Sequence, residues 1–191
     1  GCFLCMVKPF HKYDGVHQVI SGYTGGHTEN PTYEEVCSNA TGHREAIEVT
    51  FDPEVITYEQ LVSIFWKQID PTNPNGQFGD LGDSYKTAIY YVDETQKEIA
   101  ERSKRELEEN GPFEGPIVTD ILPASTFYPA EEYHQDYYQK QPFRYERYAY
   151  GSGRVPYYGR VWGEQEWQKN WKKNCTRANN MWHKKMEQTH L

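Results

Sequence analysis

The sequence predicts a two-layer α/β (α+β) sandwich with a mixed sheet, followed by a C-terminal helical tail. Segments that alternate polar and apolar residues, as strands do, are interleaved with segments of helical periodicity. The chain has 191 residues, enough for one domain with a substantial core. We expect a main domain over residues 1–155 and a helical extension over residues 156–191.

The first part of the chain is expected to hold two helices and two strands in alternation, over residues 3–12, 17–21, 31–36 and 44–51. Both strands alternate polar and apolar residues, and Asp52-Pro53 closes the second one. The glycine-rich run 22–26 is expected to break the first strand. Pro31 suits the first helical position, because that position needs no N–H donor.

The middle of the chain continues the alternation. Thr57 followed by Gln60 is a capping-box pattern, which predicts a helix that reaches about Ile69. Residues 70–83 are rich in proline, glycine, asparagine and aspartate, and a loop of this length favours a functional role. A strand is expected over residues 86–92.

The remaining segments are predicted to be a charged helix, a strand, a short aromatic helix and the tail, over residues 94–109, 117–123, 130–139 and 161–190. Asn110-Gly111-Pro112 would stop the charged helix. The tail reads as helical because its apolar residues recur at steps of three and four. That stripe consists of Trp167, Trp171, Cys175, Ala178 and Trp182.

Charge and cysteine content narrow the function classes. The net charge of −8 argues against nucleic acid as a partner. The sequence has no apolar run of about 18 residues, so we expect no membrane span. Four cysteines, at positions 2, 5, 37 and 175, are too few and too scattered for a secreted disulfide scaffold. A reducing compartment, the cytoplasm, is therefore expected.

Cys2 and Cys5 form a Cys-x-x-Cys pair at the start of the first expected helix. A helix N-terminus lowers the pKa of a thiol from about 8.5, which gives a nucleophilic thiolate at neutral pH. A second thiol three residues on can then close a disulfide. Taken alone, the pattern also fits half of a zinc site or two small buried residues.

Three further clusters hold candidate chemistry, at residues 22–33, 41–45 and 79–85. If they converge on the cysteine pair, they bring two carboxylates and two phenols to a thiol. A carboxyl with a raised pKa can donate a proton, and phenols can hold a polar oxygen. The same residues also fit ordinary turns and surface carboxylates.

In order and spacing, these motifs resemble peptide methionine sulfoxide reductase type A. The resemblance covers residues 1 to about 150, leaves the tail beyond about 155 outside, and goes with a ferredoxin-like fold. The matching segments are GCF at 1–3, GYTGG at 22–26, PTYEEVC at 31–37, TGHREA at 41–46, FDP at 51–53, GDLGDSY at 79–85 and EEYHQDYY at 131–138.

The resemblance implies reduction of the S epimer of methionine sulfoxide, free or in oxidised proteins. The Cys2 thiolate would attack the sulfoxide sulfur while Glu45, as a neutral acid, protonates the oxygen. The resemblance places Tyr33 and Tyr85 as hydrogen-bond donors to that oxygen, with Asp80 in the same polar network. The acid is needed because the sulfoxide oxygen is a poor leaving group until it is protonated, and a desolvated glutamate supplies it.

Methionine would then leave, and Cys2 would become a sulfenic acid that condenses with a second thiol. Thioredoxin, or dithiothreitol in its place, would reduce the resulting disulfide, and no other cofactor is implied. Cys5 is our first choice for the resolving thiol, because it needs little chain movement to reach Cys2. Cys175 is the second choice, and Cys37 is expected to be a packed core thiol.

Phe3 and Leu4 are expected to form an apolar cage around the substrate methyl group, with His134 as a further substrate-binding candidate. The family usually has tryptophan at the position of Leu4. We hypothesise that Leu4 opens the pocket to bulkier sulfoxides, or turns the site into one that binds sulfoxide without turnover.

A competing enzyme class is a thioredoxin-like dithiol oxidoreductase, which would not need Glu45 or the two tyrosines. His43 and His134 lack a third ligand at metal-binding spacing, so we expect them to hydrogen-bond the backbone or to shape the pocket.

Overall fold

The computed structural model describes residues 1–163. The chain divides into two compact units, Gly1–Arg154 and Val155–Leu191. Helix α7 spans Arg154–Trp162 and begins earlier than the predicted start at Val161. The predicted tryptophan stripe, with Cys175, lies outside the described residues.

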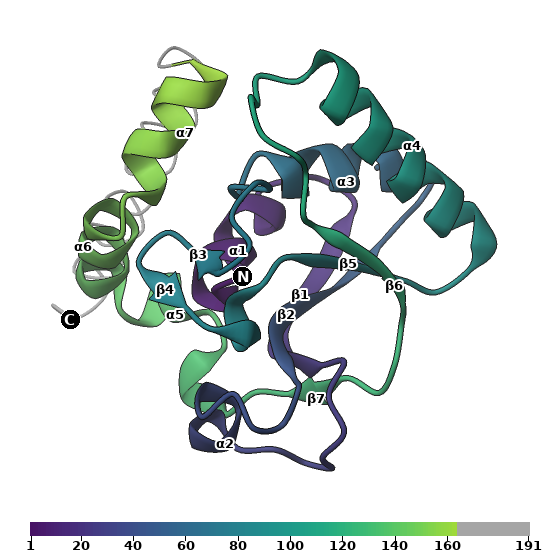
Figure 1. Cartoon of the computed structure of the whole chain (residues 1–191). Helices are drawn as coiled ribbons and strands as arrows, with labels where there is room; N and C mark the ends of the chain where they lie inside the picture. Colours follow the sequence, from purple (N-terminus) through teal and green to yellow (C-terminus); the bar gives the residue numbers. More distant parts are fainter. Residues whose placement is uncertain (164–191) are drawn as a thin grey trace, which may run out of the picture. The chain divides into compact units, whose positions relative to one another are not determined.

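The first unit contains parallel and antiparallel strand pairs in three small sheets (Figure 1). The strands are β1 (Val16–Thr24), β2 (Arg44–Phe51), β3 (Gly76–Gln77), β4 (Asp80–Leu81), β5 (Ala88–Tyr91), β6 (Asp120–Pro123) and β7 (Tyr128–Pro129). Strand β1 pairs antiparallel with β2 and β7, β3 pairs antiparallel with β4, and β5 pairs parallel with β6. The expected mixed α/β content is confirmed, whereas a single ferredoxin-like sheet stays a prediction.

Six helices and two 3-10 turns complete the described part of the first unit. They are α1 (Phe3–His11), α2 (Tyr33–Cys37), α3 (Tyr58–Trp66), η1 (Asp83–Tyr85), α4 (Glu94–Asn110), η2 (Glu132–His134), α5 (Tyr137–Lys140) and α6 (Pro142–Gly151). The predicted capping box of α3 is present. The Thr57 hydroxyl oxygen accepts the N–H of Gln60, and the side-chain oxygen of Gln60 accepts the N–H of Thr57.

A second capping box corrects the predicted start of α2. The Thr32 side chain accepts the N–H of Glu35, and Glu35 accepts the N–H of Thr32. The helix therefore begins at Tyr33, and Pro31 lies outside it. This shift places Tyr33 in the first turn of the helix.

The sequence predicts that the glycine run 22–26 ends the first strand, and this prediction is wrong. Strand β1 continues to Thr24, and its Gly22 pairs with Ala46 of β2 and with Pro129 of β7. A Cβ atom at Gly22 would lie 2.4 Å from the Tyr128 carbonyl oxygen. Glycine is needed here because β7 approaches the backbone of the central strand closely.

Three further segments differ from the prediction. The loop 70–83 contains the β3–β4 hairpin, and α6 was not foreseen. The helix expected over residues 130–139 is split into η2 and α5, with Asp136 in the left-handed conformation at φ 50°. Just before it, the Gln135 side chain accepts the N–H of Ser21 and donates to the Ala130 carbonyl. The long-range bond to Ser21 and the local bond to Ala130 thus satisfy the Gln135 side chain where the helix is interrupted.

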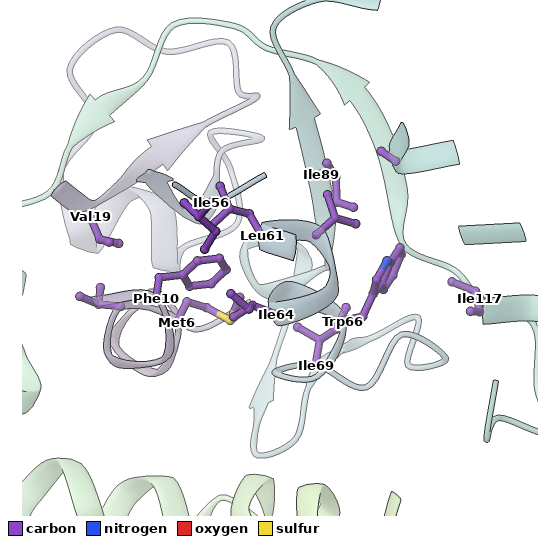
Figure 2. Close-up of a cluster of buried hydrophobic side chains, with 13 residues drawn as sticks. Met6, Phe10, Val19, Ile56, Leu61, Ile64, Trp66, Ile69, Ile89 and Ile117 are labelled. Carbon is purple, nitrogen blue, oxygen red and sulfur yellow. The ribbon is translucent and has the colours of Figure 1, made fainter. Parts of the chain in front are cut away.

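The main apolar core lies between α1, α3, the sheet of β1 and the β5–β6 pair (Figure 2). Met6 and Phe10 of α1 meet Ile64 of α3 in its centre. The helix that carries the cysteine pair is therefore anchored along its length by burial of apolar surface.

Truncation of this core tests the packing. Val62 of α3 is 4% exposed, whereas Val92 is 71% exposed. We expect Val62→Ala to lower the free energy of unfolding by about 2 kcal/mol, from the lost methyl groups and the cavity they leave. Val92→Ala, the same chemical change on the surface, should cost at most about 0.5 kcal/mol. Urea unfolding of both variants measures the difference, and equal losses would contradict the described core.

Candidate active site

The cysteine pair lies at the N-terminus of α1, as the sequence predicts. Cys2 is the N-cap residue, Cys5 follows in the first turn, and both are buried and free. Two thiols in contact titrate as a pair. The thiol pair loses its first proton at a lowered pKa, because the remaining thiol hydrogen-bonds the thiolate. It loses its second proton at a raised pKa, because the hydrogen bond between Cys5 and Cys2 is lost and burial disfavours charge.

Glu45 is the second residue of β2, opposite Tyr23 of the central strand. Its side chain is buried, and its Oε2 accepts the backbone N–H of Phe3 at 3.1 Å. Burial and then the charge of Cys2 raise the pKa of Glu45 well above 4.5. The carboxyl group is therefore held beside the cysteine helix in a setting that favours its neutral form.

Tyr33 and Tyr85 converge on Glu45 from two other elements. Tyr33 opens α2, where its N–H donates to Glu131 Oε1 at 2.9 Å, and Tyr85 closes η1. Burial is the main cause that raises the pKa of each phenol, and Glu45 contributes in both cases. Both hydroxyls therefore stay protonated donors at neutral pH, and the charge of the same carboxyl group acts on both of them.

Asp80 enters the site from the β3–β4 hairpin. Its Oδ2 accepts the hydroxyl of Tyr148, which comes from α6. The charge of Asp80 acts on both Cys2 and Glu45. The hairpin is held in place by Gln77, whose buried amide accepts the N–H of Asp70 and donates to its carbonyl. The loop 70–83 thus places the Asp80 carboxylate in the site, and the hydrogen bonds of Gln77 fix the position of its hairpin.

Aromatic rings and Leu4 surround the start of α1. Phe3 is 1% exposed, and its ring lies 5.0 Å from that of His134. The Tyr33 ring lies 4.6 Å from the same imidazole. Burial lowers the pKa of His134, so the ring is neutral at pH 7. Leu4 is half-buried and packs against the cluster that contains Phe3.

The structure also describes the surroundings of His43 and Cys37. His43 hydrogen-bonds the backbone, as expected: Nδ1 accepts the N–H of Gly26 at 3.1 Å, and Nε2 bonds the Thr28 carbonyl oxygen at 2.8 Å. Cys37 is only half-buried, which corrects its assignment as a core thiol. It is the last residue of α2, with Sγ 4.0 Å from the Tyr85 hydroxyl.

Within residues 1–163, no group of three histidine, cysteine, aspartate or glutamate residues could hold a metal ion. In the same part of the chain, no helix is long and apolar enough to cross a membrane.

Sequence reasoning missed two residues of the site, Tyr148 and Arg154. Tyr148 touches Asp80, and Arg154 is buried and acts on both Cys2 and Cys5. The aromatic repeat of residues 143–150 was the available signal for α6. Nothing in the local pattern around Arg154 distinguishes it from a solvated arginine.

Comparison with known proteins identifies the family of this chain. The family model described as peptide methionine sulfoxide reductase matches residues 1–166, somewhat further than the resemblance in sequence suggested. A peptide methionine sulfoxide reductase MsrA from Bacillus licheniformis is 60% identical over 165 residues, which is 86% of this chain and 91% of the relative.

Two solved structures are also similar. Mxr1 from Saccharomyces cerevisiae in reduced form is 30% identical, with a TM-score of 0.68, over 75% of this chain and 82% of the other. Methionine sulfoxide reductase A of Corynebacterium diphtheriae is 37% identical, with a TM-score of 0.66, over 74% and 72%. Sequence and structure agree, and the chain belongs to the peptide methionine sulfoxide reductase family.

Proposed function

We propose that Cys2, Glu45, Tyr33, Tyr85 and Asp80 carry the activity of this chain. The chain is a thiol-dependent peptide-methionine (S)-S-oxide reductase, which returns oxidised methionine to methionine. The observation that carries the assignment of roles is the buried Glu45 carboxyl group, held by the Phe3 N–H at 3.1 Å with a pKa raised by burial. A neutral acid beside a nucleophilic thiol is what sulfoxide reduction requires.

In the first step, the Cys2 thiolate attacks the sulfoxide sulfur. Because Oε2 of Glu45 accepts the Phe3 N–H, the proton of the acid resides on Oε1 and passes to the sulfoxide oxygen. The hydroxyl group then passes from the substrate sulfur to Cys2 Sγ, so that the substrate S–O bond and the transient S–S bond break and an S–O bond forms on Cys2. The products are methionine, a Cys2 sulfenic acid and a Glu45 carboxylate. The phenols of Tyr33 and Tyr85 stabilise the oxygen as its charge grows, and Asp80 orders the polar network beside the sulfur.

The methyl group of the substrate lies against Phe3 and Leu4, with the neutral imidazole of His134 on the same wall. Both ring nitrogens of His134 are buried and have no hydrogen-bond partner among the described residues. They are therefore available to a polar atom of the substrate backbone.

In the second step, the Cys5 thiolate attacks the sulfur of the Cys2 sulfenic acid. The S–S bond forms, the S–O bond breaks, and the hydroxide leaves as water after protonation. Cys5 lies one turn from Cys2, with its N–H donating to the Cys2 carbonyl oxygen at 3.2 Å, which supports Cys5 as the resolving thiol. Cys175 stays the second choice and lies outside the described residues.

Thioredoxin is the proposed reductant of the disulfide, and dithiothreitol replaces it in the assay. The balance of the cycle requires an external dithiol, because each turnover consumes two electrons.

Four finer assignments complete the proposal: a ferredoxin-like arrangement of the main domain, a boundary between residues 155 and 156, absence of a nucleic-acid or membrane partner, and a cytoplasmic location. They rest on the strand and helix order, the net charge of −8 and the low cysteine content. A role in binding sulfoxide without turnover, raised by Leu4, is not favoured, because the groups needed for turnover surround Cys2.

Replacing the acid tests its role. We expect Glu45→Gln to lower kcat/KM for dabsyl-methionine sulfoxide by about 100-fold or more, because a general acid is lost while the shape is kept. Glu48→Gln, an exposed glutamate on the same strand, is the matched control and should retain activity. Cys2→Ser should abolish turnover. Full activity of Glu45→Gln would refute the assignment.

The raised pKa of Glu45 also predicts a pH dependence of stability. Between its unfolded value near 4.5 and its higher folded value, the native chain binds more protons at Glu45 than the unfolded chain does. The contribution of Glu45 is therefore fully present below the unfolded pKa and is lost as the pH rises through the folded pKa. Urea unfolding across this range should show the loss in the wild-type chain and not in Glu45→Gln. The same slope in both proteins would argue against a raised pKa.

Peptide mapping identifies the cysteine that forms a disulfide with Cys2. After one turnover without reductant, we expect peptide mass spectrometry to find a Cys2–Cys5 disulfide. Cys5→Ser should still release one methionine per chain and should stop at the sulfenic acid, because the variant lacks the proposed resolving thiol. A Cys2–Cys175 link in the wild-type chain would transfer the resolving role to Cys175.

A further inference from the structure

Arg154, the last residue of the first unit, is a buried cation that the mechanism above leaves unused. It is only 7% exposed. Its Nη1 donates to the Gln68 carbonyl oxygen at 2.7 Å, and its guanidinium lies 4.5 Å from the centroid of the Phe78 ring. Burial of a charged group is costly unless an anion offsets it. An arginine in this position therefore calls for a negatively charged neighbour.

Two nitrogens of this guanidinium are unsatisfied. Nε and Nη2 of Arg154 are buried, and neither finds a hydrogen-bond partner among residues 1–163. The Asp80 carboxylate attracts Arg154, but it also accepts the hydroxyl of Tyr148. Buried donors without partners are rare in native proteins and mark a place where a further acceptor belongs.

The sulfurs of the cysteine pair are the strongest partners of this cation. Burial opposes the charge of Arg154, but the combined attraction of Cys5, Cys2, Tyr148 and Asp80, in decreasing order, outweighs it, so the pKa of Arg154 is raised. In return, the charge of Arg154 favours the thiolate form of both cysteines.

Other groups near the sulfurs do not supply a cation. Besides Arg154, those that act on the pair are Glu45, Asp80, Tyr145 and Tyr148. All four are acids or phenols. In the described part of the site, Arg154 is thus the positive charge that remains at neutral pH.

We propose that Arg154 stabilises the thiolate of the Cys2–Cys5 pair, with its two unpartnered nitrogens directed to the sulfur that bears the charge. This inference rests on the proposed resolving role of Cys5 and deepens it. Before the S–S bond forms, Arg154 holds Cys5 as the attacking thiolate. When an external dithiol then attacks Cys2, the S–S bond breaks, Cys5 leaves with the electron pair, and Arg154 again stabilises the anion.

The test measures thiol ionisation without any substrate. Reduced chains are alkylated with iodoacetamide over a pH series, and mass spectrometry follows the peptide that contains Cys2 and Cys5. We expect Arg154→Met and Arg154→Gln to raise the alkylation midpoint of this pair by at least about one pH unit, which lowers the rate at pH 7 about tenfold. Met is chosen because an apolar side chain of similar length leaves no buried donor unsatisfied.

Two controls separate charge from folding. Arg147→Gln removes an exposed arginine of α6 and should leave the midpoint unchanged. Arg154→Lys keeps the charge but loses the planar fork, so its midpoint should fall between those of the wild-type and neutral chains. Circular dichroism reports whether each variant is folded. If the neutral variants do not fold, the upward shift in Arg154→Lys decides the question.

A wild-type midpoint in folded Arg154→Met or Arg154→Gln would overturn the inference, as would an unshifted Arg154→Lys. Since alkylation needs no sulfoxide, the result is independent of the proposed catalytic cycle. An unshifted midpoint with normal sulfoxide turnover would remove only the role of Arg154. A shifted midpoint together with no sulfoxide reduction by the wild-type chain would support the role of Arg154 in thiolate stabilisation and refute the proposed catalytic cycle.

Discussion

The hydrogen bond from the Phe3 N–H to Glu45 Oε2 joins the helix that follows the proposed nucleophile, Cys2, to the strand that carries the proposed acid. An N–H in the first turn of a helix has no partner within the helix, so a side chain or a ligand must satisfy it. Glu45 does so from 42 residues away. This single bond sets the position of the acid relative to Cys2, and the tyrosines, the hairpin and the aromatic wall are arranged around it.

Burial has two opposite consequences in this site. For Glu45 and the two phenols it favours the neutral, proton-bearing form that the sulfoxide oxygen needs. For the thiols it disfavours the charged form that attack on sulfur needs. The conflict is resolved locally, by the sulfur–sulfur contact, by the helix N-terminus and by the buried guanidinium of Arg154. Acid and nucleophile can therefore coexist a short distance apart.

Local sequence patterns predicted much of the fold. The alternation of residues 44–51 predicted β2 with its observed bounds, and the Thr57–Gln60 box predicted the start of α3, because both signals lie within the element itself. Errors arose where distant residues decide the conformation. Gly22 continues a strand because two neighbours pair with it, and Gln135 interrupts a helix through bonds to Ser21. The motif residues of the site were found through their family pattern, whereas Tyr148 and Arg154 were missed because only the tertiary structure buries them.

The protonation state of Glu45 is the point on which the account depends most. Infrared difference spectroscopy of the reduced chain at pH 7, wild type against Glu45→Gln, reads it directly through the carbonyl stretch of a protonated carboxylic acid. We expect the wild-type chain to have such a band and the band to be missing in Glu45→Gln. A wild-type spectrum with only a carboxylate signal from Glu45 would contradict the central claim, because Glu45 would then have no proton to give.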